Sequence, residues 1–232
     1  MLSTIRSHAA RLSLSPTARA VRRERLTYLR PERLATLERL AGQVNRAAVP
    51  GDFVECGIAL AGSAIVLSTL KGDERTFHGY DVFGMIPAPS ERDPVDVHER
   101  YAAIVSGSSD GLAGDVYYGY RKDLLDHATK TFSKYGMRVG DGVHLHKGLF
   151  DDTLHPSHPI ALAHVDSDWF DPVETCLDRI GPWVSEGGFI VLDDYHDYGG
   201  CRDAADAFLA GHLEFEIVQL RPSVALQRVS AA

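Results

Sequence analysis

The sequence is poor in cysteine and has no long apolar run. Its 232 residues include three cysteines, Cys56, Cys176 and Cys201, and no two of them form a C-x-x-C pair. A disulfide framework and a structural zinc site are therefore not indicated, and a reducing cytoplasm is favoured. No stretch approaches the ~18 consecutive apolar residues of a membrane-spanning helix, so we expect no membrane partner.

Positive charge is also scarce. Lys and Arg number 24 against 32 Asp and Glu, which gives a net charge of −8 at pH 7 and disfavours a nucleic-acid partner. A charged content of 24% and a hydrophobic content of 44% are typical of a globular protein and exclude disorder. Residues 1–23 depart from this balance, with five arginines and no acid. They fit a helical arm on an acidic body, with an organellar transit peptide as the alternative.

The first strand-to-helix turn lacks the residues of the common phosphate-binding loops. Gly57 and Gly62 have the spacing of P-loop glycines, but Ser63 occupies the position of the lysine. The segment is not G-x-G-x-x-G either, which disfavours a pyrophosphate cofactor. A strand that ends near Glu55 and turns through glycine suits a ligand with an ammonium group, which the backbone can approach closely. A tight turn with a solvated glutamate is the alternative.

Strands and helices alternate along most of the chain, which predicts an α/β protein with a doubly wound, mostly parallel sheet. The short turn at 221–223 makes the last strand pair antiparallel. We expect strands at 52–55, 75–80, 143–146, 160–165, 188–192, 215–220 and 224–229. We expect helices within 1–48 and at 62–70, 121–135, 172–184 and 201–209, the fourth of them capped by Asp171.

Two segments are predicted to form lids around one domain at 49–232. Residues 1–48 read as a helical arm, and residues 84–120 read as a loop-rich insertion that is too long for an ordinary connection. Three tyrosines in the insertion, Tyr117, Tyr118 and Tyr120, fit either an acceptor pocket or a packed lid core.

Acidic side chains follow several of the predicted strands. Asp81 ends the second strand, where an acid commonly binds ribose hydroxyls. Asp166 follows the fourth strand, and Asp193 and Asp194 follow the fifth. Because parallel strands end at one edge of a sheet, these three carboxylates should converge there and repel one another. A hard divalent cation, most plausibly Mg²⁺, resolves the repulsion, and solvated helix-capping acids are the alternative.

Five segments together resemble the macrocin O-methyltransferase (TylF/MycF) family of class I S-adenosylmethionine (SAM)-dependent methyltransferases. The resemblance extends from about Tyr28 to Phe208, with two departures, Asp81-Val82-Phe83 for Asp-Ser-Phe and Asp166-Ser167-Asp168 for Asp-Gly-Asp. The segments are PGDFVECG at 50–57, KGLFDDTL at 147–154, VDSD at 165–168, SEGGFIVLDDY at 185–195 and GCRDAADAF at 200–208.

The resemblance implies a seven-stranded sheet with one reversed strand, and Mg²⁺-dependent methylation of sugar hydroxyls in natural products. Its metal aspartates map onto Asp166, Asp193 and Asp194, with Asp166 also the proposed base and His196 an alternative base. We also expect a small-molecule hydroxyl acceptor and a homo-oligomer. The expected donor-binding residues are Tyr28, Leu29, Glu55, Gly57, Gly62, Ser63, Asp81, Val82, Gly148 and Phe150.

Two other functions compete with this interpretation. Asp166-Ser167-Asp168 matches the D-x-D element of metal-dependent glycosyltransferases, although that reading leaves Glu55, Gly57 and Gly62 unexplained. A SAM-binding module without catalysis is the second alternative, because a fold does not fix a function. The acceptor's identity is left open by the sequence.

Overall fold

The computed structural model describes residues 14–230. Part of the predicted N-terminal arm, including Arg6 and Arg11, lies outside the described residues. Within residues 14–230, no helix combines the length and the apolar character needed to cross a bilayer.

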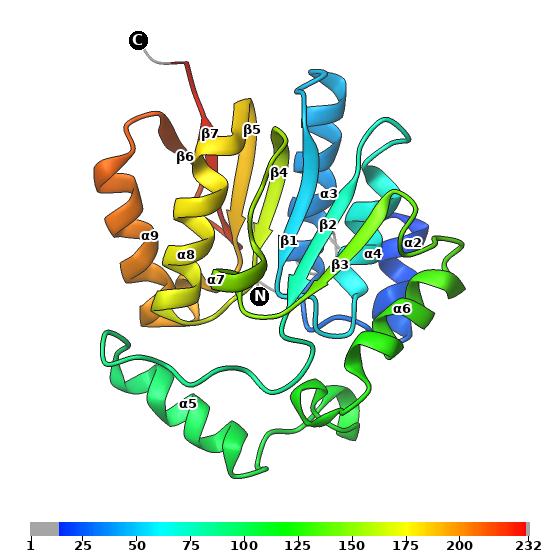
Figure 1. The fold of residues 1–232 in the computed structure, drawn as a ribbon, viewed down its shortest axis with the longest axis vertical. Coiled ribbons are helices and arrows are strands. Elements are labelled where there is room, and N and C mark those ends of the chain that lie inside the picture. The colour runs from blue at the N-terminus through cyan, green and yellow to red at the C-terminus, as the bar shows by residue number, and fades with distance from the viewer. Residues whose placement is uncertain (1–13, 231–232) are drawn as a thin grey trace, which may run out of the picture.

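A seven-stranded sheet forms the centre of the protein (Figure 1). The strand order is β3-β2-β1-β4-β5-β7-β6, and β7 runs antiparallel to both of its neighbours. This confirms the predicted doubly wound sheet with one reversed strand. The strands are β1 Asp52–Cys56, β2 Phe77–Asp81, β3 Val143–Lys147, β4 Ile160–Val165, β5 Val184–Leu192, β6 Phe215–Gln219 and β7 Val224–Arg228.

Helices pack on both faces of the sheet. One core lies under α2 Pro16–Arg23, α3 Pro31–Arg46, α4 Gly62–Leu70 and α6 Leu124–Lys134. The other lies under α8 Phe170–Ile180 and α9 Gly199–Gly211, with the short α7 Phe150–Thr153 beside them. Helix α5 Val95–Val105 lies apart, below the carboxyl ends of the strands (Figure 1). Four 3₁₀ helices in the described chain are Leu112–Gly114, Tyr118–Tyr120, Gly181–Trp183 and Asp194–His196.

The sequence pattern accounts for the core. Every residue of β4 is buried, as expected for a parallel strand covered on both faces. Helix α3 begins with Pro31 in its first turn, where the missing N–H has no intrahelical partner to lose. Its buried residues Leu34, Leu37 and Val44 recur at helical spacing and face the sheet.

Three elements differ from the prediction. The insertion 84–120 contains an 11-residue helix, α5, and is not only loop. Helix α8 begins at Phe170, two residues earlier than expected, because Asp93 of the insertion accepts a hydrogen bond from its first N–H at 2.8 Å. Strand β5 begins at Val184 and passes an irregularity in its pairing with β4 before the expected start.

Replacing Leu37 with alanine should destabilise the fold by about 2–5 kcal/mol, because a fully packed leucine leaves a cavity when truncated. Leu37 is 1% exposed on the face of α3 that contacts the sheet. Urea unfolding followed by circular dichroism measures the change. The matched control is Arg46→Ala, an exposed position on the same helix that should change the free energy of unfolding by less than about 0.5 kcal/mol. Equal effects of the two substitutions would contradict the packing described for α3.

Candidate active site

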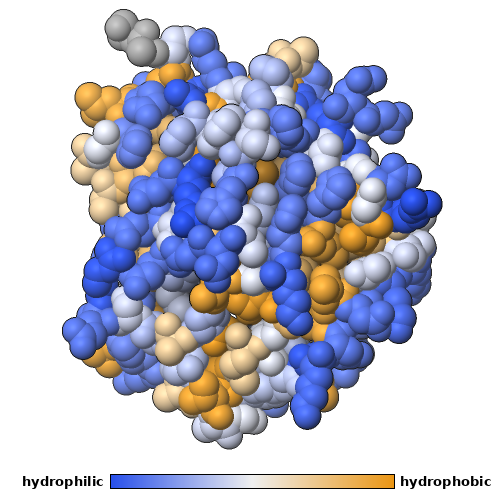
Figure 2. All heavy atoms as spheres, viewed as in Figure 1, coloured by the Kyte–Doolittle hydropathy of each residue, from blue (hydrophilic) through white to orange (hydrophobic). Residues whose placement is uncertain are grey.

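Two adjoining cavities lie at the carboxyl edge of the sheet. The larger has a volume of about 510 Å³ and the smaller about 200 Å³, and Gly57, Asp81, Asp166 and Asp168 line both. In the space-filling view, hydrophilic residues cover α8, whereas hydrophobic ones gather near the lower edge of the sheet (Figure 2). This is the edge at which open α/β sheets bind their ligands.

The turn after β1 brings its backbone against the end of β4. Gly57 has a φ of +95°, and a Cβ built on it would lie 1.9 Å from the carbonyl oxygen of Asp166. Only glycine fits both the conformation and the close approach. The turn therefore fixes the position of Asp166 relative to the first strand.

Asp81 at the end of β2 organises the same turn. Its Oδ2 accepts hydrogen bonds from the N–H groups of Ile58 and Ala59 at 2.7 and 2.9 Å, and its Oδ1 accepts one from Phe83 at 2.5 Å. Burial raises the pKa of Asp81, and these three N–H donors oppose the rise. The carboxylate thus holds the turn and also lines both cavities.

Three carboxyl groups converge between the ends of β4 and β5. Asp166, Asp168 and Asp194 each offer an oxygen within 4.8 Å of the others, and they are the one group of this kind among residues 14–230. The backbone N–H of Asp168 donates to Oδ2 of Asp194 at 3.3 Å, which connects the ends of the two strands. Oxygen atoms from three carboxylates are the ligands that a hard divalent cation prefers.

Burial shifts the protonation of all three groups. It raises the pKa of Asp166 to about 8 and that of Asp168 to about 7, with the charge of Asp193 adding to both shifts. Burial and the charges of Asp168 and Asp166 raise the pKa of Asp194 well above its usual value. Without a counter-ion, the cluster therefore retains protons near neutral pH.

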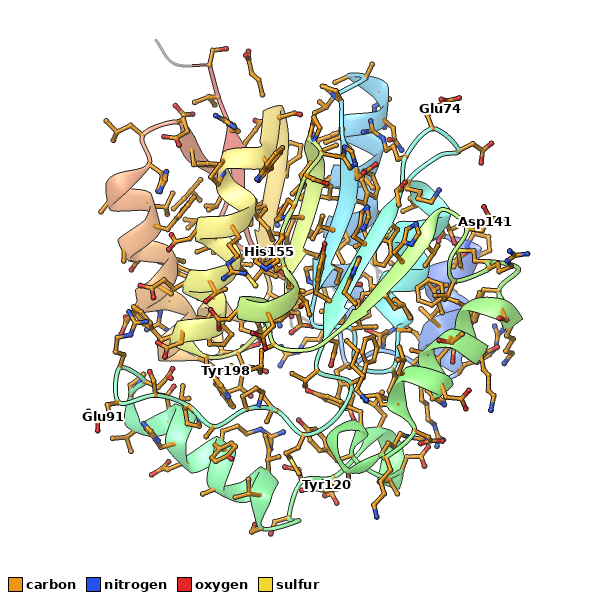
Figure 3. All side chains as sticks on the ribbon, in the orientation of Figure 1. Glu74, Glu91, Tyr120, Asp141, His155 and Tyr198 are labelled. Atoms are coloured by element: carbon orange, nitrogen blue, oxygen red, sulfur yellow. The ribbon has the colours of Figure 1, made fainter. Side chains whose placement is uncertain are left out.

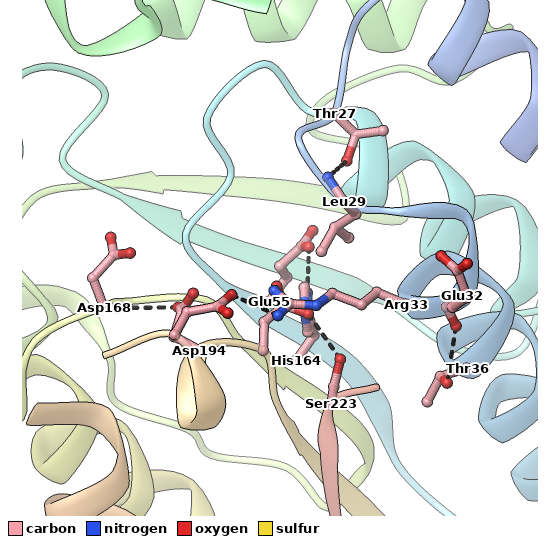
Figure 4. Close-up of polar contacts among 12 residues, drawn as sticks. Thr27, Leu29, Glu32, Arg33, Thr36, Glu55, His164, Asp168, Asp194 and Ser223 are labelled. Atoms are coloured by element: carbon pink, nitrogen blue, oxygen red, sulfur yellow. Dashed lines mark hydrogen bonds and ion pairs between the residues drawn. The ribbon is translucent and has the colours of Figure 1, made fainter. Parts of the chain in front are cut away.

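Asp193 is not part of this cluster and instead contacts Arg33 and Ser223, which Figure 4 labels. Arg33 of α3 donates to its Oδ2 at 2.5 Å, and the hydroxyl of Ser223 donates to its Oδ1 at 2.9 Å. Burial disfavours the carboxylate, but His164 and Arg33 outweigh it and lower the pKa of Asp193. Both oxygens are thus engaged in this conformation, and the expected role of Asp193 as a metal ligand stays a prediction.

Glu55 does not reach the cavities, in contrast to the expectation that it holds the donor. Its side chain is fully buried, and Glu55 pairs in register with His164 of the neighbouring β4, so the two side chains lie next to each other on one face of the sheet. Its Oε1 lies 2.7 Å from Nδ1 of His164, whose Nε2 is 3.9 Å from Asp193. Burial alone would disfavour an imidazolium, but the two carboxylates raise the pKa of His164 to about 10. Glu55 therefore acts on the site through His164.

The other expected donor-binding residues divide between the two cavities. Tyr28, Leu29 and Ser63 line the larger one, and Val82 and Phe150 line the smaller one. Gly62 and Gly148 line neither. Gly62 packs against the carbonyl of Leu26 with no room for a Cβ, and Gly148 donates its N–H to the carbonyl oxygen of Asp81 at 3.0 Å.

The expected alternative base and the lid tyrosines have defined contacts. His196 lines the larger cavity, and its Nε2 lies 2.6 Å from the carbonyl oxygen of Leu220 and must therefore carry a proton there. Tyr117 and Tyr118 also line this cavity. Tyr120 does not, because its hydroxyl donates to the carbonyl of Ile104 and packs the lid. Tyr117 and Tyr118 thus fit the interpretation as an acceptor pocket, whereas Tyr120 fits the interpretation as a packed lid core.

Several residues that line the larger cavity were missed at the sequence level, among them these four with polar side chains. Tyr198 lies between the sheet and α5 (Figure 3), and Arg33, Arg100 and Asp197 also line the larger cavity. Arg100 comes from α5, and Arg33 also donates to Asp197 at 2.5 Å. Only the helical spacing of α5 could have indicated that the insertion presents an arginine to the site.

Comparisons with known proteins agree with this geometry. The model of the macrocin-O-methyltransferase (TylF) family matches residues 17–217. Demethyldecarbamoylnovobiocin O-methyltransferase of Streptomyces niveus is 28% identical over 194 residues, covering 79% of this chain and 68% of the relative. Mycinamicin III 3''-O-methyltransferase of Micromonospora griseorubida is 27% identical over 206 residues, covering 84% and 74%.

Solved structures share the fold. The O-methyltransferase NovP superposes with a TM-score of 0.73 at 24% identity, over 88% of this chain and 82% of NovP. An O-methyltransferase from Bacillus cereus, solved with S-adenosylhomocysteine (SAH), superposes with a TM-score of 0.63 at 14% identity, over 99% and 100%. The family match spans most of the chain and the fold agrees. The chain therefore belongs to the macrocin-O-methyltransferase (TylF) family and is a SAM-dependent O-methyltransferase.

Proposed function

We propose that the chain transfers the methyl group of SAM to a hydroxyl of a sugar or of a glycosylated natural product, with Mg²⁺ held by Asp166, Asp168 and Asp194. The observation that carries the proposal is the convergence of these three carboxyls beside the donor turn. Relatives named for novobiocin and mycinamicin substrates support the class of acceptor. The glycosyltransferase alternative is set aside, because the family match spans the chain and the Gly57 turn fits a SAM site.

The two cavities suit the two ends of SAM. The smaller one, with Val82, Leu149 and Phe150, is mostly apolar and suits the adenine ring. Asp81 lies between the cavities, where it can accept hydrogen bonds from the ribose hydroxyls. The methionine end and the acceptor then share the larger cavity. Asp166, Asp168 and Asp194 line this larger cavity as well, so the acceptor would lie beside the acid cluster.

The acid cluster fits a divalent cation. Asp166 and Asp168 are half-buried and Asp194 is buried, and burial together with neighbouring carboxylates raises their three pKa values, so a cation would stabilise the site. When bound, Mg²⁺ would supply charge that lowers the pKa of an acceptor hydroxyl and orients it. Asp193 would then lie beside the cation without binding it, since Arg33 and Ser223 already donate hydrogen bonds to its two oxygens.

A proton acceptor is available in the same cluster. The carboxyl of Asp168 lines the larger cavity, where it can accept the proton of an acceptor hydroxyl as a general base. Asp166 can play the same part. The half-buried Tyr198 and Arg100 offer flat and cationic surfaces of the kind that hold a sugar ring and its hydroxyls.

Asp194→Asn should weaken Mn²⁺ binding by roughly tenfold or more and nearly abolish methyl transfer, because the cluster loses one of its charged oxygen ligands. Electron paramagnetic resonance of free Mn²⁺ measures affinity without any acceptor, and calorimetry with SAH shows whether the donor site is intact. The matched control is Asp197→Asn, an acid on the same cavity but outside the cluster, which should bind Mn²⁺ as the wild type does.

The same Mn²⁺ binding assay tests whether Asp168 or Asp193 is the third ligand. Asp168→Asn should weaken Mn²⁺ binding more than Asp193→Asn, because Asp193 is engaged by Arg33 and Ser223. The opposite order would return Asp193 to the ligand set. Unchanged Mn²⁺ affinity in Asp194→Asn would remove the proposed site altogether.

Asp81→Asn should weaken SAM binding by about 1–3 kcal/mol, the value of a hydrogen bond to a charged group. Asn keeps one carbonyl oxygen for the turn but places an NH₂ group where Asp81 accepts from Phe83 or from Ile58 and Ala59. Calorimetry with SAM measures the loss, and Asp52→Asn at the far end of β1 is the control. Wild-type affinity in Asp81→Asn would refute the ribose assignment.

Metal-free Asp168→Asn should be more stable than the wild type at about pH 8, and this gain should vanish near pH 4. The folded-state pKa values of Asp166 and Asp168, about 8 and 7, lie above the unfolded value of about 3.9. The folded chain therefore binds more protons than the unfolded chain across this window, and the cluster destabilises it increasingly as pH rises. The side chain introduced by Asp168→Asn has no charge at either pH, so the variant avoids the cost of ionising this carboxyl in the folded chain.

Thermal melts in a chelator measure this difference, at roughly 2–4 °C for each kcal/mol in a chain of this size. Asp178→Asn, an exposed acid on α8, is the control and should show no such pH dependence. A stability gain that is equal at both pH values would argue against charge repulsion in the cluster.

A further inference from the structure

A second group of potential ligands lies away from both cavities. His78 of β2 pairs in register with His144 of β3, and Tyr80 pairs with His146, so all four side chains share one face of the sheet. None of the described helices lies in front of the middle of β2 and β3 on this face (Figure 1). None of the four residues lines either cavity. The methyltransferase site therefore does not account for them.

Two imidazole nitrogens approach each other closely there. Nδ1 of His78 lies 3.2 Å from Nε2 of His146, so in the metal-free protein one of the two rings donates a hydrogen bond to the other, and a metal ion would displace that proton. Two nitrogens bound to one tetrahedral zinc ion at about 2.0–2.1 Å are about 3.3 Å apart. The observed separation is thus close to that of two ligands of a single ion, without movement of either strand.

The surrounding groups hold these rings in place. Tyr80 stacks on His146 with centroids 4.4 Å apart, and His144 stacks on His78 at 5.4 Å. On the other side of the His78 ring, Nε2 lies 3.6 Å from Oδ2 of Asp52. A carboxylate behind the second nitrogen is the usual support of a metal-binding histidine, because it fixes the N–H on that side and leaves the other nitrogen free to bind.

Burial lowers the pKa of both His78 and His146, and the neighbouring histidines add to the shift. Neutral imidazoles keep the lone pair that a metal needs. Nitrogen ligands favour zinc and similar transition metals, whereas Mg²⁺ prefers the carboxylates of the other site. The histidine nitrogens therefore favour a transition metal such as zinc, and the carboxylate cluster favours Mg²⁺.

We propose that His78 and His146 together bind Zn²⁺ or a similar divalent transition metal on the open face of β2 and β3, with His144 stacked on His78 as a support and not as a third ligand. The site joins two neighbouring strands, one of which, β3, is at the edge of the sheet. A bound ion would fasten this edge strand to β2.

The test is calorimetric titration of the tag-free protein with Zn²⁺ near pH 7, in millimolar Mg²⁺ to occupy the carboxylate cluster. We expect one Zn²⁺ per chain, with affinity reduced roughly tenfold or more in His78→Ala and in His146→Ala. His212→Ala is the matched control, because His212 is a half-buried histidine that contacts Glu214 at 3.0 Å on another part of the surface. Circular dichroism and SAH binding verify that each variant is folded.

Equal Zn²⁺ affinity in the wild type, His78→Ala and His146→Ala would overturn the proposal, as would the absence of binding to the wild type. Zinc binding that disappears in Asp194→Asn and persists in His146→Ala would place the ion at the carboxylate cluster instead, and would also overturn it. Should either alanine variant fail to fold, His146→Gln retains a polar side chain of similar size and gives the same readout. Because SAH binding is measured separately, failure of this proposal is distinguishable from failure of the proposed function.

Discussion

Repulsion among carboxylates at the carboxyl edge of the sheet is the constraint on which the site depends. Asp166, Asp168, Asp193 and Asp194 come from the ends of two adjacent strands, so the sheet itself holds them close. The surrounding residues compensate the negative charges of these four carboxyls to different degrees. Arg33 and His164 stabilise Asp193 as a carboxylate, whereas the other three retain raised pKa values. The protein is thus prepared to receive positive charge at one side of the cluster only.

The N-terminal helix α3 is part of this arrangement and not merely a cover. Its first turn carries Arg33, which reaches Asp193 and Asp197, while the apolar side of the same helix packs on the sheet. Two buried side chains, Glu55 of β1 and His164 of β4, lie in sequence behind Asp193, and Figure 4 shows them together. The orientation of one carboxylate therefore depends on three elements that are far apart in the sequence.

Much of the fold was predictable because its signals are local. Apolar strands, the glycine turn at Gly57 and the short turn before β7 each identify their element without help from distant residues. Helix α5 was missed although Val97 and Ile104 have helical spacing, because prolines and glycines around it dominated the interpretation. The start of α8 was unpredictable, since its cap comes from Asp93. The direction of Glu55 and Asp193 was equally unpredictable, because their partners lie on other strands and on α3.

The bond from Asp93 to α8 has a consequence for the timing of substrate entry. Asp93 belongs to the insertion that carries α5, and its Oδ1 accepts from the first N–H of the helix that follows the Asp168 loop. A helix cap stabilises a helix by about 1 kcal/mol. When this end of the insertion moves away from the sheet, the first turn of α8 therefore loses its cap and becomes less stable. Admission of a bulky acceptor and the order of the loop that carries Asp168 are then not independent events. The hydrogen bond from Phe170 to Asp93 couples the movement of the insertion to the order of the Asp168 loop.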